Sequence, residues 1–178
     1  MKNIFIRAAI GLSIMGSCLA VAAPASAASR LRNAYTSQGT FYLGVSGGNM
    51  SVGTPLIVWQ AAGSDQYWNL PDNSGYVWDN VTSNGTFCID VQGDPNGGLG
   101  AGLIIQRCNS TSYVEETWQL IPAAKVGFGA NYPGCYLFWN VNKGMAMGVA
   151  GGNTSLRNGT RVILWTWDTS ANQFWCPA

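Results

Sequence analysis

The sequence predicts an all-β fold in which one structural unit occurs three times. Short apolar segments rich in β-branched and aromatic residues are separated by turns of Gly, Asn and Ser, a pattern typical of β-strands. Related segments recur along the chain, as in repeat architectures. Beyond the N-terminal 27 residues, no segment has the periodicity of an amphipathic helix.

The first strand of each unit begins at a glycine and ends at a valine. The three copies are residues 39–45 (GTFYLGV), 85–91 (GTFCIDV) and 144–149 (GMAMGV). The first and third copies continue into related hexapeptides, 44–49 (GVSGGN) and 148–153 (GVAGGN), which share five of six residues. This recurrence defines three repeats.

Each repeat then adds further strands in the same order. A second apolar strand, at 56–59, 103–106 or 162–165, follows a turn that contains Gly53, Gly102 or Gly159. Each repeat next reaches an aromatic tripeptide, at 66–68 (QYW), 116–118 (ETW) and 173–175 (QFW). A fourth strand follows the first two tripeptides, at 76–78 and 136–139, and residues 31–35 can supply the one missing after the third. Repeats at about 39–80, 85–140 and 144–178, closed by a strand at 30–35, predict a twelve-stranded barrel with a hairpin cap.

The N-terminus has the features of a signal peptide. Lys2 and Arg7 give residues 1–7 a positive charge, residues 8–23 are apolar, and residues 25–27 (ASA) form a small-residue cleavage signal. We therefore expect residues 1–27 to be removed on export and residues 28–178 to form one secreted domain. The apolar run is too short for a convincing membrane span. In an alternative interpretation, residues 15–18 (MGSC) form a lipobox and Cys18 anchors a lipoprotein.

Composition and charge exclude several classes of protein. Only 10% of the residues are charged, and removal of two basic residues with the leader leaves seven basic against eight acidic residues, a net charge of −1. A nucleic-acid binder would need clustered Lys and Arg, so no nucleic-acid partner is expected. The sequence contains no histidine, which excludes histidine-based triads and histidine-ligated zinc. We expect no metal or other cofactor.

Four cysteines remain after the leader: Cys88, Cys108, Cys135 and Cys176. An even number of cysteines in an exported protein predicts two disulfides. Four cysteines allow three pairings, and their spacing does not choose among these.

Three repeats that end in Gln-x-Trp resemble the ricin B-type lectin family, whose sequences contain the (QxW)3 motif. The resemblance spans about residues 30–178, although Glu116 replaces the Gln of the middle tripeptide. It implies a single β-trefoil domain of three four-stranded repeats, with twelve short strands and pseudo-threefold symmetry. It also implies a disulfide within the middle repeat, Cys88 to Cys108, which leaves Cys135 to pair with Cys176. The Gln and Trp of the motif are expected to be scaffold rather than ligand-binding residues.

The resemblance also implies where sugars would bind. The family's sites combine an Asp on the first strand, an aromatic residue on the second, and an Asn directly before the Gln of Gln-x-Trp. Such groups suit a sugar, because a carboxylate or amide can grip neighbouring hydroxyls and an aromatic ring can cover the apolar side of a pyranose. The middle repeat has Asp90, with Gln106 in the aromatic position, Glu115 in the Asn position and Asp94 nearby. It is the best polar candidate.

The other two repeats keep the aromatic residue but have glycine in place of the acid, Trp59 with Gly44 in the first and Trp165 with Gly148 in the third. Before the Gln, the first repeat has Asp65 and the third has Asn172. Asn49 and Asn153 could supply further amides. Two roles stay open, because the tryptophans could be exposed platforms or core residues, and Asp90 could bind ligand or cap a turn.

These patterns predict a secreted, non-catalytic lectin that recognises galactose-type or related glycans. The alternative is a glycan- or receptor-binding delivery subunit of a bacterial toxin that resembles the cytolethal distending toxins, with a catalytic subunit as its partner. An enzyme is not expected, because the chain lacks histidine and a glycosidase would need a pair of carboxylates across the scissile bond. A protease inhibitor would need a rigid protruding loop, which the sequence does not identify.

Overall fold

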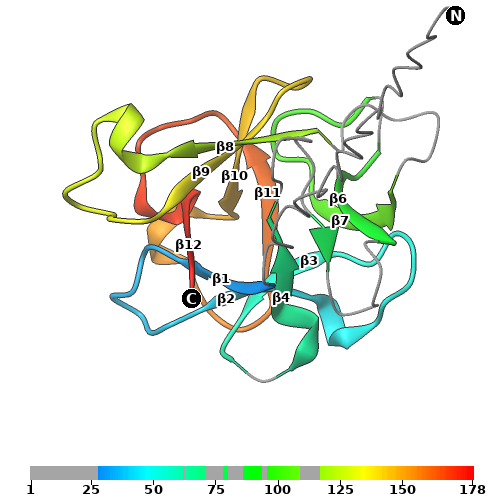
Figure 1. The fold of residues 1–178 in the computed structure, drawn as a ribbon. Coiled ribbons are helices and arrows are strands. Elements are labelled where there is room, and N and C mark those ends of the chain that lie inside the picture. The colour runs from blue at the N-terminus through cyan, green and yellow to red at the C-terminus, as the bar shows by residue number, and fades with distance from the viewer. Residues whose placement is uncertain (1–27, 62, 71–77, 80–85, 94–95, 109–116) are drawn as a thin grey trace, which may run out of the picture.

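The computed structural model describes residues 28–61, 63–70, 78–79, 86–93, 96–108 and 117–178. These residues form strands joined by turns and short 3-10 segments, which confirms the all-β prediction (Figure 1). No helix in the described ranges is long and apolar enough to cross a membrane. The expected signal peptide, residues 1–27, the alternative anchor Cys18 and the predicted site residue Asp94 lie outside the described residues.

Twelve strands are found in the described part of the chain, and all of their pairings are antiparallel. We divide them into a first segment, a middle segment and a third segment of four strands each. The first segment contains β1 (Ser29–Asn33), β2 (Tyr42–Val45), β3 (Leu56–Trp59) and β4 (Tyr67–Asn69). The middle segment contains β5 (Trp78–Asp79), β6 (Phe87–Val91), β7 (Leu103–Arg107) and β8 (Trp118–Pro122). The third segment contains β9 (Tyr136–Asn140), β10 (Met145–Val149), β11 (Thr160–Trp165) and β12 (Phe174–Pro177).

The first and last strands lie side by side. Leu31 of β1 is in register with Pro177 of β12, and Asn33 with Trp175. The same short strand also pairs with β2 and β4, so it joins the two ends of the chain to the first segment. Figure 1 shows β1 and β12 next to each other, with the C-terminus beside them. This pairing leaves neither terminal strand as an open edge on that side.

Three buried tryptophans anchor the three segments to one core. Trp68, Trp118 and Trp175 are each fully buried, and each indole Nε1 donates a hydrogen bond to a carbonyl on the second strand of its own segment. The acceptors are the oxygens of Leu43 at 3.0 Å, Ile89 at 2.9 Å and Met147 at 3.1 Å. Burial of so large a ring stabilises the fold only if the N–H is satisfied, and each of the three bonds meets that condition.

Glycine turns connect the segments in a cycle. Gly53, Gly100 and Gly159 have φ of +84°, +81° and +86°, a left-handed conformation that glycine adopts without steric cost. Their N–H groups donate to a carbonyl of the third strand in another segment, respectively those of Ile105, Leu164 and Val58. The sequence pointed to Gly102 for the middle turn, but Gly100 takes the left-handed position.

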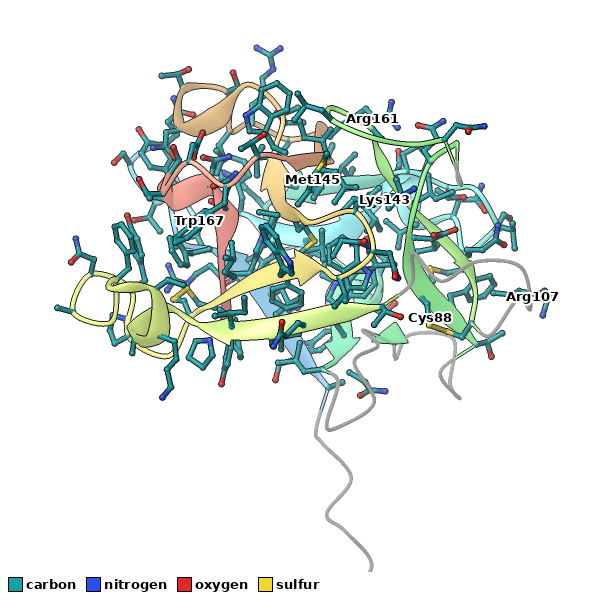
Figure 2. All side chains as sticks on the ribbon, turned by 90° about the horizontal axis from the view of Figure 1, so that it is seen from above. Cys88, Arg107, Lys143, Met145, Arg161 and Trp167 are labelled. Carbon is teal, nitrogen blue, oxygen red and sulfur yellow. A yellow bond between two sulfur atoms is a disulfide. The ribbon has the colours of Figure 1, made fainter. Side chains whose placement is uncertain are left out.

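Gly102 has a different role. A Cβ at this position would collide with the guanidinium of Arg161, which reaches over it to donate a hydrogen bond to Gln92 Oε1 at 2.6 Å. Arg161 lies at the periphery of the molecule in Figure 2. This residue therefore joins the third segment to the middle one at the surface, and glycine leaves room for the contact.

Two disulfides, Cys88–Cys108 and Cys135–Cys176, have the pairing that the family resemblance implied. The first joins β6 to the residue that follows β7. The second lies in a smaller apolar cluster that also contains Phe174 and is flanked by Phe128 and Tyr132. Figure 2 shows Cys88 and Trp167, which packs against this smaller cluster, on opposite sides of the molecule.

The tryptophans allow a direct test of which aromatic residues hold the fold. Trp68→Ala should lower the free energy of unfolding by about 3–5 kcal/mol, because it removes a fully buried ring and its hydrogen bond. Trp59→Ala is the matched control, with a ring that is 40% exposed, and should cost about 1 kcal/mol or less. Urea denaturation of both variants measures the difference. Equal losses would contradict the assignment of Trp68 to the core.

The Cys135–Cys176 disulfide should contribute strongly to stability, since it closes a loop between residues 41 apart in sequence. The chain-entropy relation gives about 4 kcal/mol for such a loop. The double variant Cys135→Ser/Cys176→Ser should lower the unfolding free energy by about that amount. Peptide mapping without reductant checks the pairing, and recovery of a Cys88–Cys135 peptide would contradict it.

Candidate functional site

Two pockets with closely similar walls lie in the first and third segments. The first pocket is lined by Val45, Gly47, Gly48, Ile57, Trp59, Gly63, Asp65 and Gln66. The third pocket is lined by Val149, Gly151, Gly152, Ile163, Trp165, Asp168 and Asn172. Their volumes are about 280 and 310 Å³. Six residues of each lining occupy matching positions in the two repeats, so the pockets are two versions of one site.

A pair of left-handed glycines forms one wall of each pocket. Gly47 and Gly48 have φ of +65° and +64°, and Gly151 and Gly152 have φ of +76° and +69°. A Cβ at Gly47, Gly48 or Gly152 would meet no atom within 4 Å, so the backbone there borders open space. The identical position of these pairs in the two hexapeptides thus produces, in both repeats, a backbone surface without side chains that a ligand can approach closely.

An exposed tryptophan also lines each pocket. Trp59 ends β3 and is 40% exposed, and Trp165 ends β11 and is 42% exposed. Each ring packs over a turn glycine from another segment, because a Cβ on Gly159 would lie 3.8 Å from Trp59 Cζ3 and one on Gly100 would lie 3.7 Å from Trp165 Cζ3. Both tryptophans are therefore exposed residues rather than core residues, and their role as platforms stays a prediction.

The glutamine of Gln-x-Trp donates hydrogen bonds to the end of the strand that carries the exposed tryptophan. Gln66 is buried, and its Nε2 donates to the carbonyls of Trp59 at 3.2 Å and Gln60 at 3.3 Å. Gln173 is also buried, and its Nε2 donates to the carbonyl of Thr166 at 2.8 Å. Both glutamines therefore hold the end of the strand that carries Trp59 or Trp165, which is a scaffold role.

The polar group of the first pocket is a carboxylate. Asp65 lies in a 3-10 turn, Ser64–Gln66, and its Oδ2 accepts a hydrogen bond from the N–H of Val45 at 3.2 Å. The side chain thus spans from the turn to β2. Its other oxygen, Oδ1, has no hydrogen-bond partner among the described residues and lies against Gly63, where a Cβ would collide with it.

The polar groups of the third pocket are an amide and an exposed acid. Asn172 is 5% exposed, and its Nδ2 donates to the carbonyl of Val149 at 3.2 Å. Its backbone N–H donates to Asn153 Oδ1 at 2.9 Å, and its carbonyl accepts from Asn33 Nδ2 at 2.9 Å. The buried Asn172 Oδ1 has no partner within the described ranges. Asp168 contributes the acid of this pocket.

The described polar residues of the middle repeat, which the sequence favoured as a sugar site, do not line either pocket. Asp90 is only 2% exposed, and its Oδ1 accepts the N–H of Val91 at 2.7 Å, so it does cap the backbone. Gln106 lies on β7, where its Oε1 accepts the N–H of Arg107 at 3.0 Å. Neither residue lines the two pockets described above. Asp94 and Glu115 lie outside the described residues, and a sugar site here stays a prediction.

Sequence reasoning placed Asp65 in the Asn position of the lectin pattern without selecting it as a site residue, and it did not identify Asp168 or the glycine pairs as site residues. The shared hexapeptide was the signal for the glycines. The asparagines of the same hexapeptide do not line either pocket, since Asn153 Oδ1 accepts the N–H of Asn172, and Asn49 Oδ1 accepts the hydroxyl of Ser51 at 2.8 Å. No group of three potential metal-ligating side chains was found in the described part of the chain.

Comparison with solved structures shows that the fold is similar to that of a designed threefold-symmetric protein and of several lectins. The designed threefold-symmetric protein ThreeFoil matches with a TM-score of 0.67 and 21% identity, covering 85% of this chain and 97% of that one. The C-half of the earthworm R-type lectin, in complex with GalNAc, matches with a TM-score of 0.60 and 14% identity over 85% and 97% of the two chains. The Macrolepiota procera ricin B-like lectin, in complex with lactose, matches with a TM-score of 0.60 and 16% identity over 88% and 97%.

These likenesses establish the fold and, at such low identities, the fold alone. No protein-family model and no curated protein matches the sequence. The class defined by fold and pockets is thus a β-trefoil with two related surface cavities, each lined by a tryptophan and by polar side chains.

Asn153 should stabilise the wall of the third pocket, while its counterpart Asn49 should not do so for the first. Asn153→Ala removes the acceptor for the N–H of Asn172 and should cost about 0.5–1.5 kcal/mol in unfolding free energy. Asn49→Ala removes an exposed bond to Ser51 and should change stability by less than about 0.5 kcal/mol. Thermal denaturation of the pair measures this, and a larger loss for Asn49→Ala would refute the asymmetry.

Proposed function

We propose that this protein is an exported, non-catalytic lectin that binds a neutral saccharide in both the first and the third pocket. The observation that carries the proposal is the recurrence of one arrangement, in which an exposed tryptophan, an acidic or amide side chain and a pair of left-handed glycines line the same cavity. A stacking face, a hydroxyl-binding group and a small cavity are what recognition of a pyranose requires.

The chemistry of each wall matches one face of a sugar ring. The apolar C–H face of a pyranose lies against the indole of Trp59 or Trp165, where both surfaces lose contact with water. The hydroxyls on the other side donate to the carboxylate of Asp65 in the first pocket, or exchange hydrogen bonds with Asn172 and Asp168 in the third. Each site is shallow, so useful affinity comes from engaging both at once.

A galactose-type ligand is the best starting hypothesis. Two of the structural relatives were determined in complex with GalNAc and with lactose, both of which contain a galactose-type ring. Catalysis is not part of the proposal, because each pocket lining contains one carboxylate and glycoside hydrolysis uses a flanking pair. The toxin-subunit alternative stays a prediction without a specific observation in its favour.

Removal of the platforms tests the proposal. Wild type should bind immobilised lactose or GalNAc, and isothermal titration should give two sites. Trp59→Ala and Trp165→Ala should each lose one site and keep the other, because losing the stacked indole weakens a pocket by about 10- to 100-fold. The double variant should lose binding.

Asp90→Asn is the comparison for the middle repeat. Unchanged stoichiometry would leave the two pockets as the working sites, whereas loss of one site would restore the middle repeat as a ligand-binding unit. If wild type binds no glycan on a broad array, or if the double variant binds as well as wild type, the lectin proposal is wrong.

A further inference from the structure

The first and middle repeats carry their carboxylates on different elements, a 3-10 turn in the first repeat and a strand in the middle one. In the middle repeat, Asp90 on β6 accepts the N–H of the next residue, Val91, at 2.7 Å. In the first repeat, the corresponding N–H belongs to Val45, and the carboxylate of Asp65 accepts it from the 3-10 turn at 3.2 Å. The same backbone donor is therefore satisfied from the strand in one repeat and from across the pocket in the other.

Glycine on the strand makes this exchange possible. A Cβ at Gly44 would lie 3.0 Å from Asp65 Oδ2 and 3.1 Å from Gln66 Cγ, closer than ordinary van der Waals contact. The Asp65 carboxylate thus occupies the volume that a strand side chain would need. Gly44 does not have a left-handed φ, so the neighbouring side chains, rather than the backbone conformation, exclude a larger residue there.

The third repeat shows what the same glycine does without an acid in the turn. A Cβ at Gly148 would lie 3.0 Å from Gln173 Cγ and 3.3 Å from Asn172 Nδ2. The amide fills the space, but it donates to the carbonyl of Val149 instead of accepting an N–H. Of the two pockets, only the first therefore has a turn carboxylate that accepts the N–H of the strand valine.

We propose, on the basis of the lectin function proposed above, that Asp65 is the ligand-binding carboxylate of the first pocket. We also propose that Gly44 and Asp65 form an exclusive pair, in which an acid at position 65 requires glycine at position 44. Val45 occupies Asp65 Oδ2, and Oδ1, which has no partner among the described residues, is left to accept hydroxyl hydrogens from a neutral sugar in the pocket that Asp65 lines. Charge-assisted bonds of this kind are about twice as strong as neutral ones.

The position of this carboxylate also sets selectivity. The described lining of the first pocket includes no Lys or Arg, so the charge of Asp65 has no cation beside it there. A sugar carboxylate would enter unpaired next to a like charge, which is unfavourable. The first pocket should therefore select a neutral hexose over the corresponding uronic acid.

A cycle of variants at the two positions tests the exclusive pair. The Trp165→Ala background silences the third pocket, and lactose titration then reports on the first. Asp65→Asn should weaken binding at least about tenfold, because the N–H of Val45 claims the amide oxygen and leaves an NH2 group facing the ligand. Gly44→Asp should also weaken it at least about tenfold, because the new carboxylate would stand against that of Asp65, whose Oδ2 lies 3.0 Å from the position of a Cβ at Gly44.

The double variant Gly44→Asp/Asp65→Asn should restore lactose binding to within about threefold of the parent, because an amide at position 65 removes the repulsion between two acids and the new strand acid can accept the N–H of Val45 as Asp90 accepts that of Val91. A purely structural Asp65 would not alter ligand choice, so the ratio of affinities for galactose and galacturonate is the second readout. Asp65→Asn should reduce this ratio at least about threefold.

The third pocket, measured in a Trp59→Ala background, separates the two levels of the argument. If it binds lactose while Asp65→Asn leaves the first pocket unaffected, or while the double variant is no better than Gly44→Asp, the inference is wrong and the lectin function stands. If neither pocket of wild type binds lactose, galactose or GalNAc, the proposed galactose-type function fails first, and with it this inference.

Discussion

The fold and both pockets depend on the hydrogen bond from a buried tryptophan to the second strand of its own segment. In the first segment, the indole of Trp68 holds the carbonyl of Leu43, which directly precedes Gly44 and Val45 at the pocket wall. The same tripeptide contains Gln66, which holds the end of the platform strand at Trp59. One short motif thus holds both the strand that precedes Gly44 and the end of the strand that carries Trp59. Burial of the ring supplies stability, and the direction of its N–H supplies geometry.

Much of the fold could be predicted from sequence, because strands, turns and motif tryptophans are local signals. The position of the third-segment strands and the role of Trp175 follow from such patterns. The middle turn was less predictable, since two glycines are candidates and only the contact of Arg161 with Gln92 decides that Gly102 is needed for space. Disulfide pairing came from family resemblance, because spacing between cysteines contains no information on distance in the fold.

The site was harder to predict than the fold. Matching residues one by one to the lectin pattern favoured Asp90, yet that side chain is nearly buried and caps its neighbour. The pattern treats each position independently, whereas the structure couples them, because the side chain absent at Gly44 makes room for Asp65. Exposure of Trp59 could not be read from its strand, whose other residues are apolar and buried. The space shared by two side chains, which the sequence does not show, decides whether the strand or the turn carries the acid.

The central claim is that Trp59 and Trp165 are sugar platforms, whereas the tryptophans of the three aromatic tripeptides belong to the core. The most direct measurement is the ¹H–¹⁵N spectrum of the indole N–H groups during titration with lactose, assigned by Trp→Phe variants. The account predicts saturable shifts for Trp59 and Trp165, and only small changes for the hydrogen-bonded indoles of Trp68, Trp118 and Trp175. Saturable shifts confined to other residues, with both platform signals unmoved, would contradict it.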